Sequence, residues 1–93
     1  MSFQPERREI FFTGRVQGVG FRYTARDIAA DFAVAGYVRN LDDGRVHLVA
    51  EGEPAEIDAF LAKLAARMQP NIRHVDQRPS ENKGEFTVFE IRF

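Results

Sequence analysis

The sequence lacks cysteine and tryptophan altogether and has only two histidines among its 93 residues. Without cysteine it can form no disulfide bond, no thiolate nucleophile and no cysteine-ligated metal site. Secreted chains this short often need disulfide bonds for stability, so the composition favours the cytoplasm. The two histidines, His47 and His74, lie far apart in the sequence and have no cysteine partners, so we expect no metal site.

Long apolar runs and an excess of one charge are also missing. No segment approaches the roughly 18 apolar residues of a membrane-spanning helix, and the first residues lack the apolar segment of a signal peptide. Thirteen Lys and Arg residues against fourteen Asp and Glu give a formal net charge of −1, too little to attract nucleic acid or anionic lipid. We therefore expect a soluble protein that binds neither a membrane nor nucleic acid.

The hydrophobic content is sufficient for one folded domain. Hydrophobic residues make up 44% of the chain, and nine residues are Phe. A domain of this size hides only about 60 to 65% of its unfolded surface, so a large cofactor such as haem or flavin would compete with the core for apolar side chains. We expect no cofactor. Because nothing in the composition requires a partner chain, we also expect a monomer.

Hydrophobic periodicity predicts the element order β-α-β-β-α-β. Residues 10–16 alternate in the manner of a strand, an apolar stripe of helical spacing begins at Phe21, and Gly36 suits the position after that helix ends. The remaining predicted elements are strands over 37–41, 46–50 and 86–93 and a second helix that begins at Pro54 and stops before Gln69.

Two segments between these elements predict either a turn or no definite structure. Asp42-Asp43-Gly44 favours a hairpin turn over a pair of catalytic carboxylates. Residues 71–79 are ambiguous and include a possible short strand near Val75, and a polar loop follows over 80–85. The pattern predicts an α+β fold of the ferredoxin-like βαββαβ type, an antiparallel sheet of four to five strands with two helices on one face.

The segment from Gly14 to Arg22, between a strand and a helix start, has the features of an anion cradle. Gly18 and Gly20 allow backbone N–H groups to converge, the helix start adds free N–H groups, and Arg22 adds a planar clamp for phosphate. From spacing alone, a glycine-containing turn with a solvated arginine explains the segment equally well. ATP and NAD motifs both fail, because no Lys precedes Lys63 and Tyr23 stands where a third glycine would be required.

Asn40 is the unusual residue of the run from Gly36 to Gly44. An amide near the end of a β-prone segment either enters the turn or is placed to make hydrogen bonds, and propensity favours the turn.

Taken together, the segment 14–22 (Gly-Arg-Val-Gln-Gly-Val-Gly-Phe-Arg) and the segment 36–40 (Gly-Tyr-Val-Arg-Asn) with Gly44 resemble the two signature blocks of the acylphosphatase family. The resemblance continues through Val46, residues 50–52, the second helix and residues 89–93. It therefore predicts an acylphosphatase-like domain over 9–93, preceded by a flexible N-terminal extension over 1–8.

The resemblance implies an enzyme that hydrolyses the carboxyl-phosphate bond of small acyl phosphates without a metal ion. It implies that Arg22 and Asn40 are catalytic, with Arg22 on the phosphoryl group and Asn40 on the attacking water. The phosphate-binding loop implied by the resemblance consists of Gln17, Gly18, Val19, Gly20, Phe21 and Arg22.

Two positions depart from the family pattern. Members commonly carry an acidic residue where His47 stands, and a Gly-Pro pair with a small residue following where this chain has Gln69-Pro70-Asn71-Ile72-Arg73. Both lie outside the signature blocks, so we expect them to alter local structure more than activity.

Three other functions fit parts of the sequence. Ferredoxin-like folds include RNA-binding modules, and Phe11, Phe86 and Val88 could line an open sheet face, although the RNA-recognition consensus is absent. A sensor that binds a small anion without turnover would need the cradle but not Asn40, so Asn40 is the residue that argues against this alternative. A domain at the start of a larger carbamoyl-transfer maturation protein would carry the same blocks, but the length of the chain argues for an independent protein.

Overall fold

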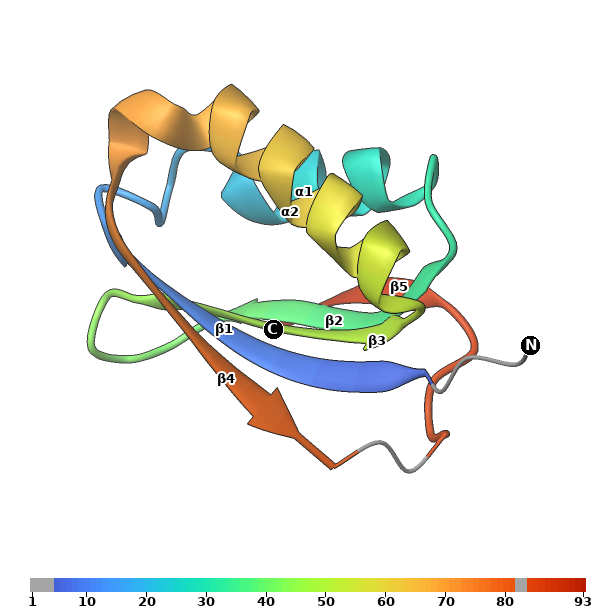
Figure 1. Cartoon of the computed structure of the whole chain (residues 1–93). Helices are drawn as coiled ribbons and strands as arrows, with labels where there is room; N and C mark the ends of the chain where they lie inside the picture. Colours follow the sequence, from blue (N-terminus) through green and yellow to red (C-terminus); the bar gives the residue numbers. More distant parts are fainter. Residues whose placement is uncertain (1–4, 82–83) are drawn as a thin grey trace.

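The computed structural model describes residues 5–81 and 84–93. The elements within these residues are β1 (Glu6–Gly14), α1 (Phe21–Ala29), β2 (Val34–Asn40), β3 (Val46–Gly52), α2 (Pro54–Met68), a short 3-10 helix (Gln69–Asn71), β4 (Ile72–Ser80) and β5 (Phe89–Arg92). Both α-helices lie on one face of a twisted sheet, as Figure 1 shows. The predicted two-layer α+β fold is confirmed.

The sheet contains five strands in the order β4-β1-β3-β2-β5 within the described residues. The pairs β1–β3, β1–β4 and β2–β3 are antiparallel. The pair β2–β5 is parallel, with Gly36 opposite Phe89, so the sheet is mixed where the sequence suggested a wholly antiparallel one. The reason is topological, because the chain crosses from β4 at one edge to the far edge before β5 begins, and β5 then runs in the direction of β2.

The last two strands differ in length from the prediction. The ambiguous stretch over 71–79 forms β4, an edge strand that pairs with β1 from Arg7 to Gly14. Its mostly exposed, polar residues gave little hydrophobic signal, and Pro79 is tolerated because it lies on an edge strand. β5 covers four residues only, because it pairs with β2 over Gly36 to Arg39 alone.

The first helix ends earlier than predicted, and Gly36 is not the residue that follows its end. α1 stops at Ala29, and Gly36 lies inside β2, paired with Ala50 of β3. Phe32, which follows the helix in a turn, still packs against the core beside Phe60. The pairing of β2 with β3 over Val34–Asn40 decides where the helical segment gives way to a strand, and it outweighs the helical spacing of the apolar residues before it.

The predicted N-terminal extension overlaps β1. Glu6, Arg7 and Arg8 belong to that strand, and the Arg7 Nε lies 2.8 Å from the Glu51 carboxylate. Residues 1–4 of the extension lie outside the described residues, and the flexibility of the extension stays a prediction.

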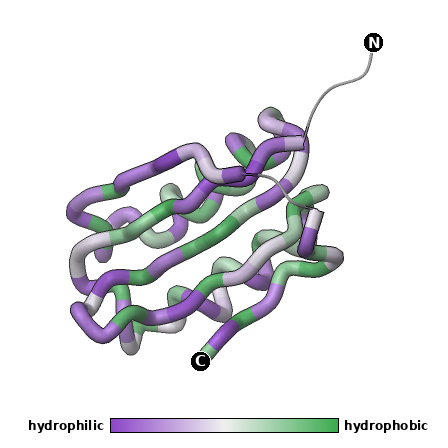
Figure 2. The backbone as a smooth tube through the Cα atoms, turned by 90° about the horizontal axis from the view of Figure 1, so that it is seen from below, coloured by the Kyte–Doolittle hydropathy of each residue, from purple (hydrophilic) through white to green (hydrophobic). Residues whose placement is uncertain are grey.

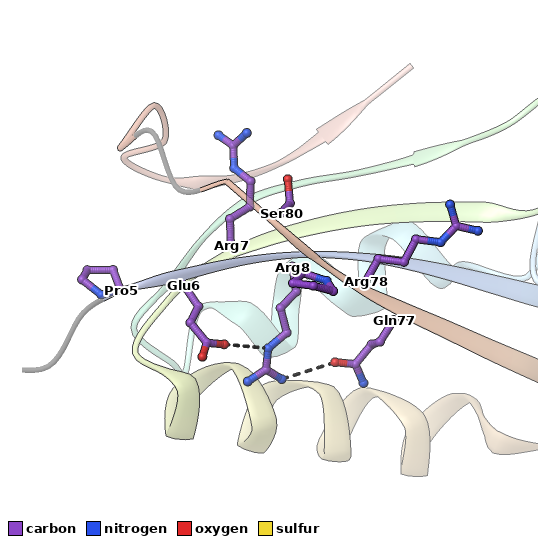
Figure 3. Close-up of a pocket in the computed structure, with 8 residues that line it drawn as sticks. Pro5, Glu6, Arg7, Arg8, Gln77, Arg78 and Ser80 are labelled. Atoms are coloured by element: carbon purple, nitrogen blue, oxygen red, sulfur yellow. Dashed lines mark hydrogen bonds and ion pairs between the residues drawn. The ribbon is translucent and has the colours of Figure 1, made fainter.

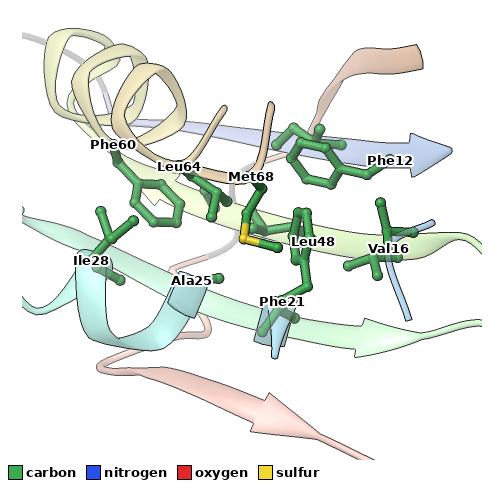
Figure 4. Close-up of a cluster of buried hydrophobic side chains, with 14 of the residues drawn as sticks. Phe12, Val16, Phe21, Ala25, Ile28, Leu48, Phe60, Leu64 and Met68 are labelled. Carbon is green, nitrogen blue, oxygen red and sulfur yellow. The ribbon is translucent and has the colours of Figure 1, made fainter. Parts of the chain in front are cut away.

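The core lies between the helices and the sheet. Side chains from both helices and from β1, β2 and β3 interdigitate there, as Figure 4 shows for part of the cluster. Its buried members are Ile10, Phe12, Val16, Phe21, Ala25, Ile28, Ala29, Val38, Val46, Leu48, Ala50, Ile57, Phe60, Leu64 and Met68. In the described residues no helix is long and apolar enough to cross a membrane.

Among the described residues, no helix covers the opposite face of the sheet, where polar and apolar residues are mixed. Viewed from that side, hydrophobic and hydrophilic residues alternate along the strands (Figure 2). His47 of β3 is buried on this face, stacked on Phe11 with ring centroids 4.7 Å apart. Arg39 Nε donates to His47 Nδ1 at 3.1 Å, and His47 Nε2 lies 3.0 Å from the Glu9 carboxylate.

Those contacts define the protonation state of His47. Because Arg39 donates to Nδ1, the ring is neutral and Nε2 carries the proton that it donates to Glu9. Burial lowers the pKa of His47 below its ordinary value, the hydrogen bond to Glu9 opposes that shift, and the positive charges of Arg39 and Arg45 add to it. The folded protein therefore binds the His47 proton less readily than the unfolded chain does.

We predict that His47 makes the protein sensitive to mild acid. Since the folded-state pKa lies below the unfolded value of about 6.5, His47 contributes stability above that value and loses it as pH falls through the folded-state pKa. The free energy of unfolding in urea should therefore fall more steeply on acidification in wild type than in His47→Gln, whose amide reproduces both hydrogen bonds. Equal slopes in the two proteins would contradict the prediction.

We also predict that Gly36→Ala destabilises the protein severely. Gly36 has φ +142°, and an added Cβ would collide with the backbone carbonyl oxygen of Val49. Backbone strain alone costs about 1 to 3 kcal/mol, and the collision adds to it, so the free energy of unfolding should fall by more than about 3 kcal/mol. Gly44→Ala is the matched control, since nothing lies within 4 Å of its Cβ position, and it should cost only about 1 to 2 kcal/mol.

Candidate active site

The predicted anion cradle is the connection between β1 and α1. It bends repeatedly over residues 17–20, with Gly18 at φ +75° and Gly20 at φ +79°, and open space surrounds both Cβ positions. Gly20 is the residue that precedes α1, and its carbonyl accepts the Thr24 N–H at 3.0 Å. Left-handed backbone at two alternate residues curls the loop so that successive N–H groups converge.

The cradle provides backbone N–H groups from which no other group among the described residues accepts a hydrogen bond. In the part of the chain that the structure describes, no backbone carbonyl accepts a hydrogen bond from the N–H groups of residues 17–21. The first turn of α1 contains no acidic residue and no side chain caps it. The positive end of the helix dipole and the free N–H groups therefore favour a bound anion at this point.

Arg22 extends from the first turn of α1 beside these donors. Its Nη1 donates to the backbone carbonyl of Arg92 at 3.3 Å, and its guanidinium carbon lies 4.7 Å from the ring centroid of Phe93. Among the described residues no carboxylate forms an ion pair with it, so its charge is available to an anionic ligand. These contacts with the C-terminal residues could not be predicted from the sequence, because they depend on the parallel pairing of β5 with β2.

Asn40 is the last residue of β2, opposite Val46 of β3. The turn that follows is closed by the Leu41 N–H donating to Arg45 at 2.9 Å, and Asp43 accepts hydrogen bonds from Arg45. Asp43 therefore stabilises the hairpin turn, as the sequence indicated. Asn40 stays within the strand rather than in the turn, which fixes the backbone from which its amide extends.

Gln17 connects the cradle to this hairpin. Its side-chain Nε2 donates to the carbonyl oxygens of Leu41 at 2.7 Å and Arg45 at 3.0 Å. Sequence reasoning assigned Gln17 only a backbone role in phosphate binding. Its side chain holds the loop against the segment that carries Asn40, a long-range contact that the sequence alone does not indicate.

A small cavity lies where these elements meet. Its volume is about 170 Å³, and its lining comprises Val16, Gly18, Gly20, Phe21, Arg22, Tyr23 and Asn40. Five of the seven predicted site residues are thus brought together, while Gln17 and Val19 are not part of the lining. The sequence analysis did not predict Tyr23 as a site residue. Its position next to Arg22 in the first turn of α1 is the feature of the sequence that could have indicated it.

A larger cavity, about 430 Å³, lies at the other end of β1 and is less suited to an anion. Figure 3 shows Arg8 there between Glu6 and Gln77. Arg8 also pairs with Asp58 at 2.6 Å, and Arg7 pairs with Glu51 and Glu85. Because both arginines already contact carboxylates, their charge is largely compensated.

The chemistry of the small cavity is limited to binding and orientation. Its lining includes a guanidinium, an amide and a phenol, together with backbone N–H groups, but no imidazole and no carboxylate. Within residues 5–81 and 84–93, no group of three or more His, Asp and Glu side chains has an arrangement that could hold a metal ion. Such a site suits an anionic substrate with a leaving group that needs no strong acid catalysis.

Comparison with known proteins identifies the family of the chain. The family model described as Acylphosphatase matches residues 8–91. The acylphosphatase of Archaeoglobus fulgidus is 40% identical over 88 residues, which cover 91% of this chain and 96% of that protein. The acylphosphatase of Methylococcus capsulatus is 43% identical over 89 residues, covering 92% and 95% of the two chains.

Solved structures give the same result. The crystal structure of acylphosphatase from Bacillus subtilis aligns with a TM-score of 0.83 and 30% identity, covering 95% of this chain and 99% of that one. Full-length HypF in its phosphate- and nucleotide-bound form aligns with a TM-score of 0.80 and 30% identity over 97% of this chain, but over only 12% of HypF. Because the family model spans nearly the whole chain, the protein belongs to the acylphosphatase family and hydrolyses acyl phosphates.

Proposed function

We propose that the small cavity is the catalytic centre for this hydrolysis and that its residues act without a metal ion. The observation that carries the proposal is the meeting of three groups at one cavity: the glycine backbone of the cradle, the Arg22 guanidinium and the amide of Asn40. The N–H groups of the loop and the Arg22 guanidinium bind the phosphoryl oxygens. Asn40 holds the attacking water.

The reaction requires one bond to form and one to break. The water oxygen forms a bond to phosphorus while the bridging bond from phosphorus to the acyl oxygen breaks, and its electron pair leaves on the carboxylate. An acyl phosphate dianion and water thus give a carboxylate and dihydrogen phosphate, which retains both hydrogens of the water. Because the carboxylate is a good leaving group, no general acid is required.

What the protein must supply is orientation and charge stabilisation. The donors of the cradle are fixed by the backbone before the substrate arrives, so little reorganisation is needed in the transition state. Holding the water in line with the leaving oxygen replaces an unfavourable encounter with an intramolecular step. A single preorganised donor contributes about 2.7 to 4 kcal/mol in comparable oxyanion sites, which corresponds to rate factors of roughly 10² to 10³.

We further propose that the protein is a cytoplasmic monomer that binds no nucleic acid. The absence of cysteine fits a reducing compartment, and the net charge of −1 gives no attraction to a polyanion. On the open sheet face, the guanidinium groups of Arg45 and Arg78 lie 4.8 and 5.1 Å from the centroid of Phe11. Because these arginines and His47 pack against the Phe11 ring, it is poorly available for stacking on a base.

Substitution of Arg22 should abolish most activity with little loss of stability. Arg22→Ala should lower kcat/KM for acetyl phosphate by roughly 10² to 10³ and should also weaken competitive inhibition by inorganic phosphate. Arg22→Lys should fail as well, because an ammonium cannot reproduce the bidentate fork. Arg67→Ala, an exposed arginine at the end of α2, is the matched control and should behave like wild type. Near-native turnover by Arg22→Lys would argue against the clamp.

Substitution of Asn40 should affect turnover without affecting phosphate binding. Asn40→Ala should lower kcat by roughly 10² to 10³ while leaving the inhibition constant for inorganic phosphate almost unchanged, because the cradle and Arg22 remain. Both variants should be assayed with a chelator present, which should not reduce wild-type turnover. Full activity in Asn40→Ala would exclude a role in holding the water, and loss of wild-type turnover on chelation would exclude the metal-free mechanism.

A further inference from the structure

Among the exposed side chains that line the cavity, Tyr23 is the one to which the proposed mechanism gives no task. Gly18, Gly20 and Arg22 bind the phosphoryl group and Asn40 holds the water. The side chains of Val16 and Phe21 are 1% and 2% exposed and belong to the core, so they form only the floor. Tyr23, by contrast, is 51% exposed, which is high for an aromatic ring at the edge of a polar site.

The size of the cavity determines where the acyl part of the substrate lies. At about 170 Å³ it is smaller than the roughly 300 to 1,000 Å³ of sites that enclose a whole small molecule. It can hold the phosphoryl group and the attacking water. The acyl group therefore extends to the mouth of the cavity, where lining side chains remain exposed.

The geometry of in-line displacement also places the acyl group at the mouth of the cavity. The leaving oxygen lies opposite the attacking water across phosphorus, so the acyl group points away from the amide of Asn40. Arg22 is committed to the phosphoryl oxygens. Of the side chains that line the cavity, Tyr23 is then the exposed one that remains to contact the acyl group.

The ring of Tyr23 is already held in position. The guanidinium carbon of Arg26, one turn further along α1, lies 5.3 Å from the ring centroid, within the range of a cation–π contact. The Arg26 Nε lies 4.0 Å from the Asp27 carboxylate, a long ion pair. A ring fixed in this way presents apolar surface to a ligand at little cost in side-chain entropy.

We propose that Tyr23 is a specificity-determining residue whose ring contacts the acyl group, so that the gain in kcat/KM from an aroyl group over an acetyl group depends on this side chain. This inference rests on the proposed catalytic role of the cavity. A contact of this kind is made in the ground state and in the transition state alike. It therefore acts mainly on KM and leaves kcat nearly unchanged.

The test compares benzoyl phosphate with acetyl phosphate as substrates of the wild type, Tyr23→Ala and Tyr23→Phe. Wild type should have the higher kcat/KM for benzoyl phosphate. Tyr23→Ala should lower kcat/KM for benzoyl phosphate roughly 3- to 10-fold, through KM, and change that for acetyl phosphate less than about twofold. Tyr23→Phe keeps the ring and should resemble wild type.

Val88→Ala is the matched control, an exposed apolar residue that is not part of the cavity lining. It should leave both substrates unaffected. An equal loss for both substrates in Tyr23→Ala, or no loss for either, would overturn the assignment of Tyr23. If wild type hydrolyses both substrates and both Arg22→Ala and Asn40→Ala are fully active, the proposed catalytic role of the cavity fails and the assignment of Tyr23 fails with it. If those two variants lose activity but Tyr23→Ala matches wild type, only the assignment of Tyr23 fails.

Discussion

The burial of Phe21 is the constraint on which the proposed active site depends. Phe21 is the first residue of α1, it is 2% exposed, and its ring packs against Phe12 of β1 with centroids 4.9 Å apart. Because this ring is fixed in the core, the residues on either side of it are fixed as well. Gly20 and Arg22 are thereby held at the mouth of the cavity, without any ligand being needed to order them.

A second set of contacts connects the cradle to the residue that lies across from it. Gln17 bonds to the carbonyl oxygens of Leu41 and Arg45, at the two ends of the β2–β3 turn, and Asn40 directly precedes that turn. The separation between the cradle and the strand that carries Asn40 is thus set by one side chain and one strand pairing. A small protein can hold the groups of the proposed site in this way because the supporting contacts are made to the backbone and to the core.

The two departures from the family pattern are accommodated away from the cavity. His47 replaces an acidic residue by joining Arg39 and Glu9 in a hydrogen-bonded chain on the open face of the sheet. The stretch that begins at Gln69 forms a short 3-10 helix and then enters β4 at Ile72. The carbonyl of Asn71 lies close to Gly14, so this segment packs against the start of the cradle, where a side chain larger than hydrogen on Gly14 would not fit.

The sequence by itself determined the family, the two-layer fold and most of the residues that meet at the cavity, because each is recorded in local patterns: helical stripes, a turn signal, and two motifs around Arg22 and Asn40. Only the tertiary structure decided what depends on strand pairing. The pairing of β2 with β3 placed Gly36 inside a strand, that of β1 with β4 turned an ambiguous segment into an edge strand, and that of β5 with β2 made the sheet mixed. The bridge from Gln17 and the position of Tyr23 at the cavity likewise join residues through space, and a hydrophobic pattern along one chain carries no information about such contacts.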